Sequence, residues 1–281
     1  MTSTVTSTVD QYLHDQISAL RTAEDAIGRD DPEGVHDMRV SVRRLRDCLR
    51  TFRASFDPNL VRLLTPELSW LADVLGRARD VEVLRRRITA QLEEVPDELI
   101  LGPVWSEFDR YLARPEADTM AAVRDALAGD RYRQLLSTLD LVVADRPKKK
   151  QLRRAIRKRA RKVKSAVGQV SSAPDHGLAL HNVRKKAKRL RYACEVAEPV
   201  LGKPARKVRK RSKQIQRTLG DHHDSVQVRA ALRELGARAQ VDGVNGFTFG
   251  LLQGRLGEHA RGLEDDFAGE WRRLAGSTAL R

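Results

Sequence analysis

The chain has 281 residues, of which 41% are hydrophobic and only 5% are aromatic, and its formal net charge is +15. This length can hold one large domain or two of ordinary size, and no apolar run approaches the roughly 18–20 residues that a membrane-spanning helix needs. The start, MTSTVTSTVD, lacks the basic and hydrophobic regions of a secretory signal, so we expect a cytoplasmic protein with ordinary thiols at Cys48 and Cys194.

Apolar residues recur at helical spacing along almost the whole chain, and continuous β-branched runs are nearly absent. The spacing predicts helices near 5–27, 34–55, 58–76, 79–94, 102–127 and 130–144, and again near 148–168, 177–199, 203–219, 223–237 and 244–274. Pro and Gly mark the expected breaks, and Pro115 is expected to break or kink its helix. We therefore predict an all-α fold, with a join between two halves at the sequence DRP, residues 145–147.

Two sequence elements recur in the same order in both halves. VHDMRVSVRRLRDCL at 35–49 matches LHNVRKKAKRLRYAC at 180–194, and LGRARDVEV at 75–83 matches LGDHHDSVQ at 219–227. A repeat of this kind indicates internal duplication. It predicts two repeated antiparallel helical bundles, 1–145 and 146–281, related by a pseudo-twofold axis, with a basic groove or pore between them.

The positive charge is concentrated in one segment. Residues 146–217 contain 26 Lys and Arg and only three acidic residues, whereas the rest of the chain contains 27 basic and 35 acidic residues. All 13 lysines lie between Lys148 and Lys213. Apolar residues run through this segment at helical spacing, so it is not a disordered tail. Such a concentration of charge indicates a polyanionic partner.

Each copy of the first element places an apolar stripe beside a cationic stripe, at about 100° per residue. The cationic stripe of the first copy contains His36, Arg39, Arg43, Arg46 and Arg50, and that of the second contains His181, Arg184, Lys188 and Arg191. The apolar stripe is expected to anchor each helix in its bundle and so to fix the orientation of the cations. The first stripe covers about 21 Å of helix, which suits an extended chain of phosphates better than one small ligand.

The pattern His-x-x-Arg-x-x-x-(Arg/Lys)-Arg-Leu-Arg, followed by Leu-Gly-x-x-(Arg/His)-Asp and duplicated, resembles the CHAD family, the conserved-histidine α-helical domains. The matching residues are His36, Arg39, Arg43, Arg44, Leu45 and Arg46, then Leu75, Gly76, Arg79 and Asp80, and in the second half His181, Arg184, Lys188, Arg189, Leu190 and Arg191, then Leu219, Gly220, His223 and Asp224. The resemblance covers nearly the whole chain. It implies two helical bundles, a basic central surface and binding of inorganic polyphosphate. Some family members carry a triphosphatase-type domain with a Glu-x-Glu-x-Lys strand motif, which is absent here, so we expect a stand-alone CHAD protein.

The predicted polyphosphate-binding residues come from the duplicated motifs and from two flanking helices of the second half. The motifs supply His36, Arg39, Arg43, Arg46, Arg50, Arg79, His181, Arg184, Lys185, Lys188, Arg191 and His223, and helices 148–168 and 203–219 supply Arg153, Arg157, Lys164, Lys210, Lys213 and Arg217. Either edge of each flanking helix could face the site. The corresponding helices of the first half are poor in Lys and Arg, so we expect a lopsided binding surface.

An enzymatic alternative comes from DHHD at 221–224, which together with His181 resembles the ligands of metal phosphohydrolases. The simpler interpretation is that Asp224 pairs with an arginine or caps a helix and that His222 is exposed to solvent. The duplication favours this interpretation, because Arg79 occupies the position of His223 and an arginine does not serve as a metal ligand. We therefore expect no enzyme activity, no metal and no cofactor.

Nucleic-acid binding is the main competing function, because charge alone permits it. Few aromatic residues are available for base stacking on the basic helices, Tyr192 being the clearest, so we expect only nonspecific binding at low salt. A further alternative is that the histidines are structural residues of the core. The sequence predicts a cytoplasmic polyphosphate-binding protein, with association with polyphosphate granules as a further expectation, and leaves the oligomeric state open.

Overall fold

The computed structural model describes residues 7–145 and 147–277, so the expected first residues of the first helix and Arg146 of the join lie outside the described residues. Every element within these ranges is helical: α1 (Thr8–Gly28), α2 (Gly34–Thr51), α3 (Pro58–Glu93), α4 (Val104–Ala128), α5 (Asp130–Asp140), α6 (Lys149–Gly168), α7 (His176–Leu201), α8 (Lys203–Val241) and α9 (Phe247–Ala275), with short 3-10 helices at Arg53–Ser55 and Asp97–Leu99. The predicted all-α fold is confirmed. In the described part of the chain, none of the helices is both long and apolar enough to cross a membrane.

Local signals explain where the helices that carry the motifs begin and end. Asp175 precedes α7 and accepts a hydrogen bond from the backbone N–H of Leu178, which satisfies one of the free donors of the first turn. The helix ends at Gly202, whose φ of 63° lies in the left-handed region that glycine adopts without strain. Pro204 then occupies the first turn of α8, where its missing N–H has no cost.

The predicted breaks near residues 77 and 221 are wrong. The expected helices 58–76 and 79–94 are one helix, α3, and the expected helices 203–219 and 223–237 are one helix, α8. Helix α4 likewise continues through Pro115, where a break or kink was expected. The Leu-Gly-x-x-(Arg/His)-Asp element therefore lies in the middle of a long helix in each half.

The glycine of this element serves close packing rather than a turn. An added Cβ at Gly76 would lie 3.6 Å from the Arg39 guanidinium, and one at Gly220 would lie 3.3 Å from Nε of Arg184. The motif arginine of the neighbouring helix passes over each glycine, and at Gly76 an added Cβ would make an ordinary contact with it. The tightest contact is at Gly220, where a side chain would force Arg184 to move.

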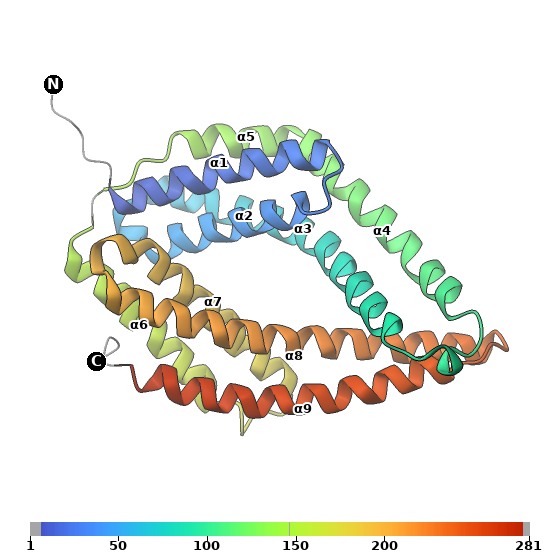
Figure 1. The fold of residues 1–281 in the computed structure, drawn as a ribbon. Helices are drawn as coiled ribbons and strands as arrows, with labels where there is room; N and C mark the ends of the chain where they lie inside the picture. Colours follow the sequence, from blue (N-terminus) through green and yellow to red (C-terminus); the bar gives the residue numbers. More distant parts are fainter. Residues whose placement is uncertain (1–6, 146, 278–281) are drawn as a thin grey trace.

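The two halves show the same succession of elements and meet at both ends of the molecule. In each half a first helix packs on the motif helix, the motif helix packs on a long helix, and the long helix packs on a fourth helix: α1 to α4 in the first half and α6 to α9 in the second. Helix α5 is an addition of the first half. Contacts of α7 with α1 and α2 join the halves at one end, and contacts of α8 with α3 and α4 join them at the other. Figure 1 shows α2 and α3 along one side of the molecule and α7 and α8 along the other.

Two buried cores hold these junctions. The apolar stripes of α2 and α7 lie in the larger core, with Leu45 and Leu190 completely buried, and the other α-helices of both halves also contribute buried residues to it. The smaller core joins Ile88 and Phe108 of the first half to Leu232 and Phe249 of the second. Buried apolar packing therefore crosses the expected boundary between residues 145 and 146.

Candidate functional site

A groove of about 1380 Å³ lies between α2 and α3 on one side and α7 and α8 on the other. Nine of the predicted binding residues line it: His36, Arg39, Arg43, Arg79, His181, Arg184, Lys188, Arg191 and His223. These are the residues of the duplicated motifs, and both halves contribute. The helical spacing of the motifs thus brings residues about 145 positions apart in the sequence into one cavity.

Three imidazoles lie in the groove among cations. The rings of His181 and His223 approach each other with centroids 4.1 Å apart. Burial and then the charge of His223 lower the pKa of His181 to about 4. Burial also lowers the pKa of His36, where Arg79 is the next cause, and the pKa of His223, where Arg184 is the next cause. All three rings are therefore largely neutral at pH 7 in the free protein, and each can donate one N–H.

The arginines and the lysine of the groove are crowded and poorly compensated by negative charge. Burial lowers the pKa of Lys188 well below its ordinary value, and Arg43, Arg184, Arg39 and Arg191 lower it further. Arg43 and Lys188 have no ion pair among the described residues. The buried Nε atoms of Arg39, Arg184 and Arg191 have no hydrogen-bond partner there either. Buried donors without partners and mutually repelling charges are the arrangement that an anion would relieve.

Three carboxylates, Asp80, Asp224 and Glu234, stand among the described lining residues of the groove, and Glu234 is paired with Arg238. Asp80 is exposed and lies 3.3 Å from Nη2 of Arg39. Asp224 lies 3.3 Å from Nη2 of Arg87, which also pairs with Asp221 and so ties α3 to α8. The pairing of Asp224 with an arginine agrees with the simpler interpretation of DHHD.

His222 differs from the expectation that it is exposed to solvent. It is 4% exposed, and its Nε2 lies 2.9 Å from Oε1 of Glu264 on α9. The other oxygen of Glu264 lies 2.9 Å from Nε2 of His176, so one carboxylate joins the beginning of α7, the middle of α8 and α9. The described residues include no group of three or more His, Cys, Asp or Glu suited to a metal ion. His222 thus has a structural environment outside the groove.

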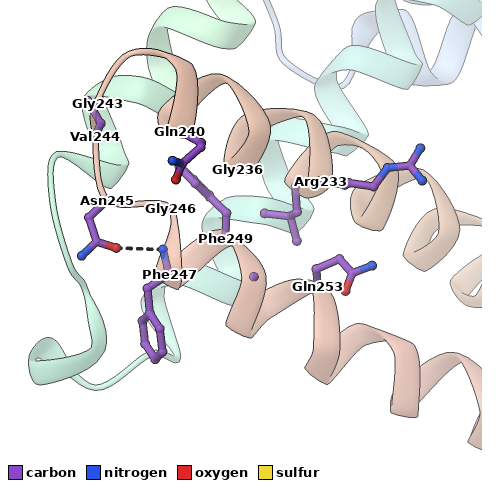
Figure 2. A pocket seen from close by; sticks show the side chains of 12 residues that line it. Arg233, Gly236, Gln240, Gly243, Val244, Asn245, Gly246, Phe247, Phe249 and Gln253 are labelled. Carbon is purple, nitrogen blue, oxygen red and sulfur yellow. Dashed lines mark hydrogen bonds between the residues drawn. The ribbon is translucent and has the colours of Figure 1, made fainter.

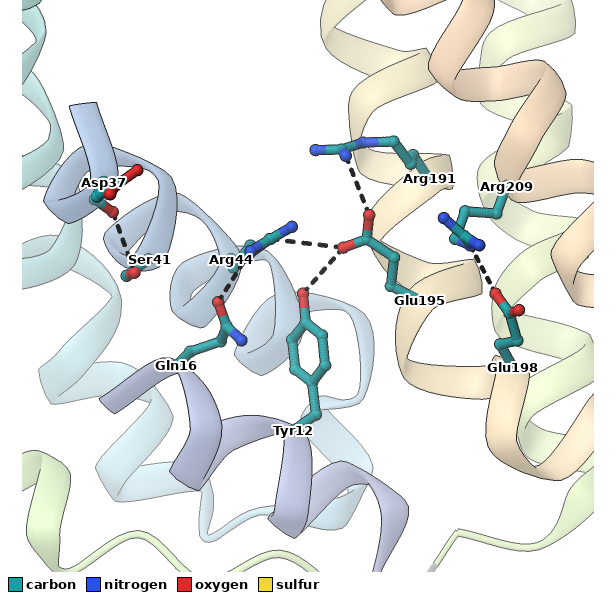
Figure 3. A network of polar contacts seen from close by, with 9 residues as sticks. All are labelled: Tyr12, Gln16, Asp37, Ser41, Arg44, Arg191, Glu195, Glu198 and Arg209. Atoms are coloured by element: carbon teal, nitrogen blue, oxygen red, sulfur yellow. Dashed lines mark hydrogen bonds and ion pairs between the residues drawn. The ribbon is translucent and has the colours of Figure 1, made fainter. Parts of the chain in front are cut away.

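A polar network fixes one end of the groove, as Figure 3 shows. Glu195 of α7 lies 3.0 Å from Nη1 of Arg191 and 3.5 Å from Nε of Arg44 on α2, and it accepts a hydrogen bond of 3.4 Å from the Tyr12 hydroxyl on α1. Tyr192 is buried beneath the two arginines, with the Arg191 guanidinium 4.6 Å from the centre of its ring. These contacts join three helices and hold two groove cations in place.

Sequence reasoning missed several residues of the groove wall: Arg44, Asp80, Arg86, Tyr111, Tyr192, Gln216, Asp224, Gln227, Arg233 and Glu234. Arg44, Asp80 and Asp224 belong to the motifs and could have been included on that ground. Arg86, Gln216 and Arg233 lie on the long helices α3 and α8, outside the motifs. With Arg44, Arg86 and Arg233 added, cations come from both halves, so the expected lopsidedness does not apply to the groove itself.

Nine of the predicted binding residues do not line the groove: Arg46, Arg50, Arg153, Arg157, Lys164, Lys185, Lys210, Lys213 and Arg217. Those on α6 and α8 are exposed on other faces of these helices, and Gln216 rather than Arg217 faces the groove. Arg46 and Arg50 lie past the end of the groove, beside Asp47 and Arg189. The choice between the two edges of each flanking helix could not be made from a sequence that is basic on both sides of the apolar stripe.

A second cavity, with a volume of about 830 Å³, lies where the C-terminal end of α8 meets the N-terminal end of α9 (Figure 2). It surrounds the turn in which Oδ1 of Asn245 accepts a hydrogen bond of 2.9 Å from the backbone N–H of Phe247. Arg233 is the one charged residue among its described lining residues. This cavity therefore lacks the charge that an anion site needs.

Known proteins resemble this chain over almost its whole length. It is 33% identical over 279 residues to the uncharacterized protein Rv2226 of Mycobacterium tuberculosis, strain H37Rv, and 32% identical to the uncharacterized protein MT2285 of strain CDC 1551, in each case covering 95% of this chain and 53% of the relative. The chain thus spans about half the length of these curated relatives.

Two solved structures share the fold. The CHAD domain from the plant Ricinus communis superposes with a TM-score of 0.72 at 25% identity, covering 97% of this chain and 92% of that one. PptA from Streptomyces chartreusis superposes with a TM-score of 0.73 at 18% identity, covering 94% and 98%. The family model for the CHAD domain matches residues 11–233, a range that contains both motif copies and every predicted residue of the groove. The chain therefore belongs to the CHAD domain family.

Proposed function

We propose that the groove binds inorganic polyphosphate and that the protein acts by binding rather than by catalysis. The observation that carries this proposal is the set of half-buried, poorly compensated cations contributed by both halves, above all Arg43, Arg184 and Lys188. Membership of the CHAD family supports it, because CHAD proteins are linked to polyphosphate binding. Association with polyphosphate granules would follow from such binding.

The shape of the groove favours a flexible polyanion over a compact ligand. Its cations are distributed along α2, α3, α7 and α8, so a single phosphate group could reach only a few of them. A polyphosphate chain carries one charge on each internal phosphate and can bend along the groove. Arginine donates to two phosphate oxygens at once, and lysine adds a point charge.

A binding role also accounts for the acidic residues and histidines without a reaction. Asp224 is engaged by Arg87, and His222 is engaged by Glu264. The first half has Arg79 at the position of His223, and Arg79 is buried and paired with Glu82. The neutral imidazoles are suited to donating a hydrogen bond to a phosphate oxygen.

Nonspecific nucleic-acid binding at low salt remains the second candidate, because the net charge favours any polyanion. The structure offers little for base recognition, since Tyr192 is only 2% exposed and lies beneath Arg191.

Competition at about 0.15 M salt, close to physiological ionic strength, tests the proposal. Labelled polyphosphate is bound to the protein and challenged with unlabelled polyphosphate, duplex DNA, single-stranded RNA and ATP, at equal concentrations of phosphate. We expect polyphosphate to compete far better than the other three. Equal competition by DNA or RNA would reject polyphosphate in favour of the nucleic-acid candidate.

A further inference from the structure

A second group of cations lies beyond the groove, where the C-terminal end of α2 meets α6 and α7. We define the outer cluster as Arg46, Arg50, Arg159, Lys162, Lys186 and Arg189. We propose that the outer cluster is a second binding site for the same polyanion, occupied by the part of a long chain that leaves the groove past Arg43. This inference rests on the proposed function and extends it to chain length.

Contacts between three helices build the cluster. Nε of Arg189 on α7 lies 3.6 Å from Oδ1 of Asp47 on α2, and Asp47 is 5% exposed. Arg159 of α6 donates a hydrogen bond of 2.6 Å to the hydroxyl of Thr51, the last residue of α2. These contacts hold Arg159 and Arg189 in place and bring α6 and α7 against the C-terminal end of α2, where Arg46 and Arg50 lie.

Positive charge greatly exceeds negative charge in the outer cluster. Among the described residues, Asp47 is the one carboxylate in an ion pair with any of the six cations. Burial lowers the pKa of Lys186, and Arg189, Lys162, Lys185 and Arg159 lower it further, which places these like charges beside it. Arg50 and Lys162 are exposed and so accessible to a ligand. The C-terminal end of α2 favours cations through its dipole, but it supplies no counter-ion.

Arg46 connects the outer cluster to the groove. It lies almost one turn beyond Arg43 on α2, and its Nε is buried without a hydrogen-bond partner among the described residues. Burial lowers its pKa, and both Arg43 of the groove and Arg50 and Arg189 of the outer cluster lower it further. The step from Arg43 to Arg50 is seven residues, about 10.5 Å of helix. A continuous row of cations therefore runs from the groove to the cluster.

This arrangement predicts that long chains gain affinity from a second point of attachment. A tripolyphosphate in the groove is too short to reach the outer cluster, whereas a long chain held in the groove keeps its remaining phosphates at high local concentration around the cluster. More phosphates are then neutralised, so the affinity for long chains depends more steeply on salt.

Two variants that lose the same charge test the inference. The first, Arg50→Gln/Lys162→Gln/Lys186→Gln, removes three cations of the outer cluster and leaves Arg46 and the contacts of Arg159 with Thr51 and of Arg189 with Asp47 unchanged. The control, Arg29→Gln/Arg62→Gln/Arg261→Gln, removes three exposed arginines that lie at the end of α1, in α3 and in α9, in that order. The affinity of each variant and of the unchanged protein is measured for tripolyphosphate and for a long polyphosphate chain over a range of salt concentrations.

We expect the cluster variant to bind the long chain about fivefold or more weakly than the control variant, with a shallower salt dependence, because it forms fewer phosphate contacts. The two variants should bind tripolyphosphate alike. Equal binding of the long chain by both variants, or a parallel loss for tripolyphosphate in the cluster variant, would overturn the outer site while leaving the groove proposal intact. A failure of the unchanged protein to bind either phosphate would reject the proposed function itself.

Discussion

Lys188 lies among four arginines of the groove, and this environment controls its protonation. Burial and the charges of Arg43, Arg184, Arg39 and Arg191 lower its pKa well below the ordinary value. A bound phosphate chain would have the opposite effect, because an anion nearby favours the ammonium form. Binding should therefore raise the pKa of Lys188 and take up protons from solution. Since the bound state holds more protons, the affinity should increase as the pH falls.

The first prediction is that the affinity for polyphosphate decreases as the pH rises toward the ordinary pKa of lysine, because the pKa of Lys188 in the free protein lies well below that value. Calorimetry in buffers of different ionisation enthalpy should show net proton uptake on binding. The variant Lys188→Arg keeps the charge at all these pH values and should take up fewer protons. Binding without proton uptake in the unchanged protein would contradict the account of Lys188.

At the scale of helices, the motif pattern predicts α2 and α7 well and α3 and α8 poorly. The apolar and cationic stripes of α2 and α7 follow directly from a period of 3.6 residues. Gly76 and Gly220, by contrast, look like helix ends in the sequence, because a helical glycine is unfavourable unless something compensates. The compensation is the passage of Arg39 and Arg184 over these glycines, a tertiary contact that no local pattern contains.

The second prediction compares the two glycines. An alanine at Gly76 meets only ordinary contacts, at 3.6 Å from Arg39, whereas an alanine at Gly220 comes within 3.3 Å of Nε of Arg184. Both substitutions favour the helix by about 0.5–1 kcal/mol. We expect Gly76→Ala to keep its polyphosphate affinity and Gly220→Ala to lose affinity because Arg184 is displaced. Melting temperatures and dissociation constants check both, and a larger loss in Gly76→Ala than in Gly220→Ala would speak against this role.

The third prediction separates folding from binding on α7. Leu190 is completely buried in the larger core. Its replacement by alanine should lower the free energy of unfolding by about 2–5 kcal/mol, through lost burial and a residual cavity. Chemical denaturation measures this change. At a temperature where the variant is folded its polyphosphate affinity should match that of the unchanged protein, and a specific loss of affinity would mean that Leu190 shapes the groove directly.

At the scale of the whole molecule, the groove is formed by two halves that are joined at both ends. The network of Glu195, Arg44 and Tyr12 joins them at one end, and Arg87 with Asp221 and Asp224 contributes to the other. The duplication in the sequence indicated a groove between halves but could not show which faces of α6 and α8 border it. Which face of each helix borders the groove depends on packing between the halves. Arg159 of α6 contacts α2, and Gln216 of α8 lines the groove.

The fourth prediction concerns Arg87, which restrains two carboxylates beside the groove. The variant Arg87→Met removes this partner, and Asp224 is then free to pair with Arg184 and to repel phosphates. Polyphosphate affinity should fall several-fold, and the loss should exceed that expected from removing one charge. The second change Asp224→Asn should restore most of the affinity. No rescue by this change would indicate that Arg87 acts by holding the halves together.

The variant Arg43→Gln/Arg184→Gln/Lys188→Gln removes three groove residues that have no ion pair among the described residues and that we propose bind polyphosphate. These side chains border the core without filling it. Arg43 and Arg184 repel each other and both disfavour the ammonium form of Lys188, so replacing the three relieves repulsion in the free protein. The melting temperature should therefore stay the same or rise. Polyphosphate affinity at about 0.15 M salt should fall by more than about tenfold, because several phosphate contacts are lost together. Affinity equal to that of the unchanged protein, in a variant that folds normally, would contradict the account.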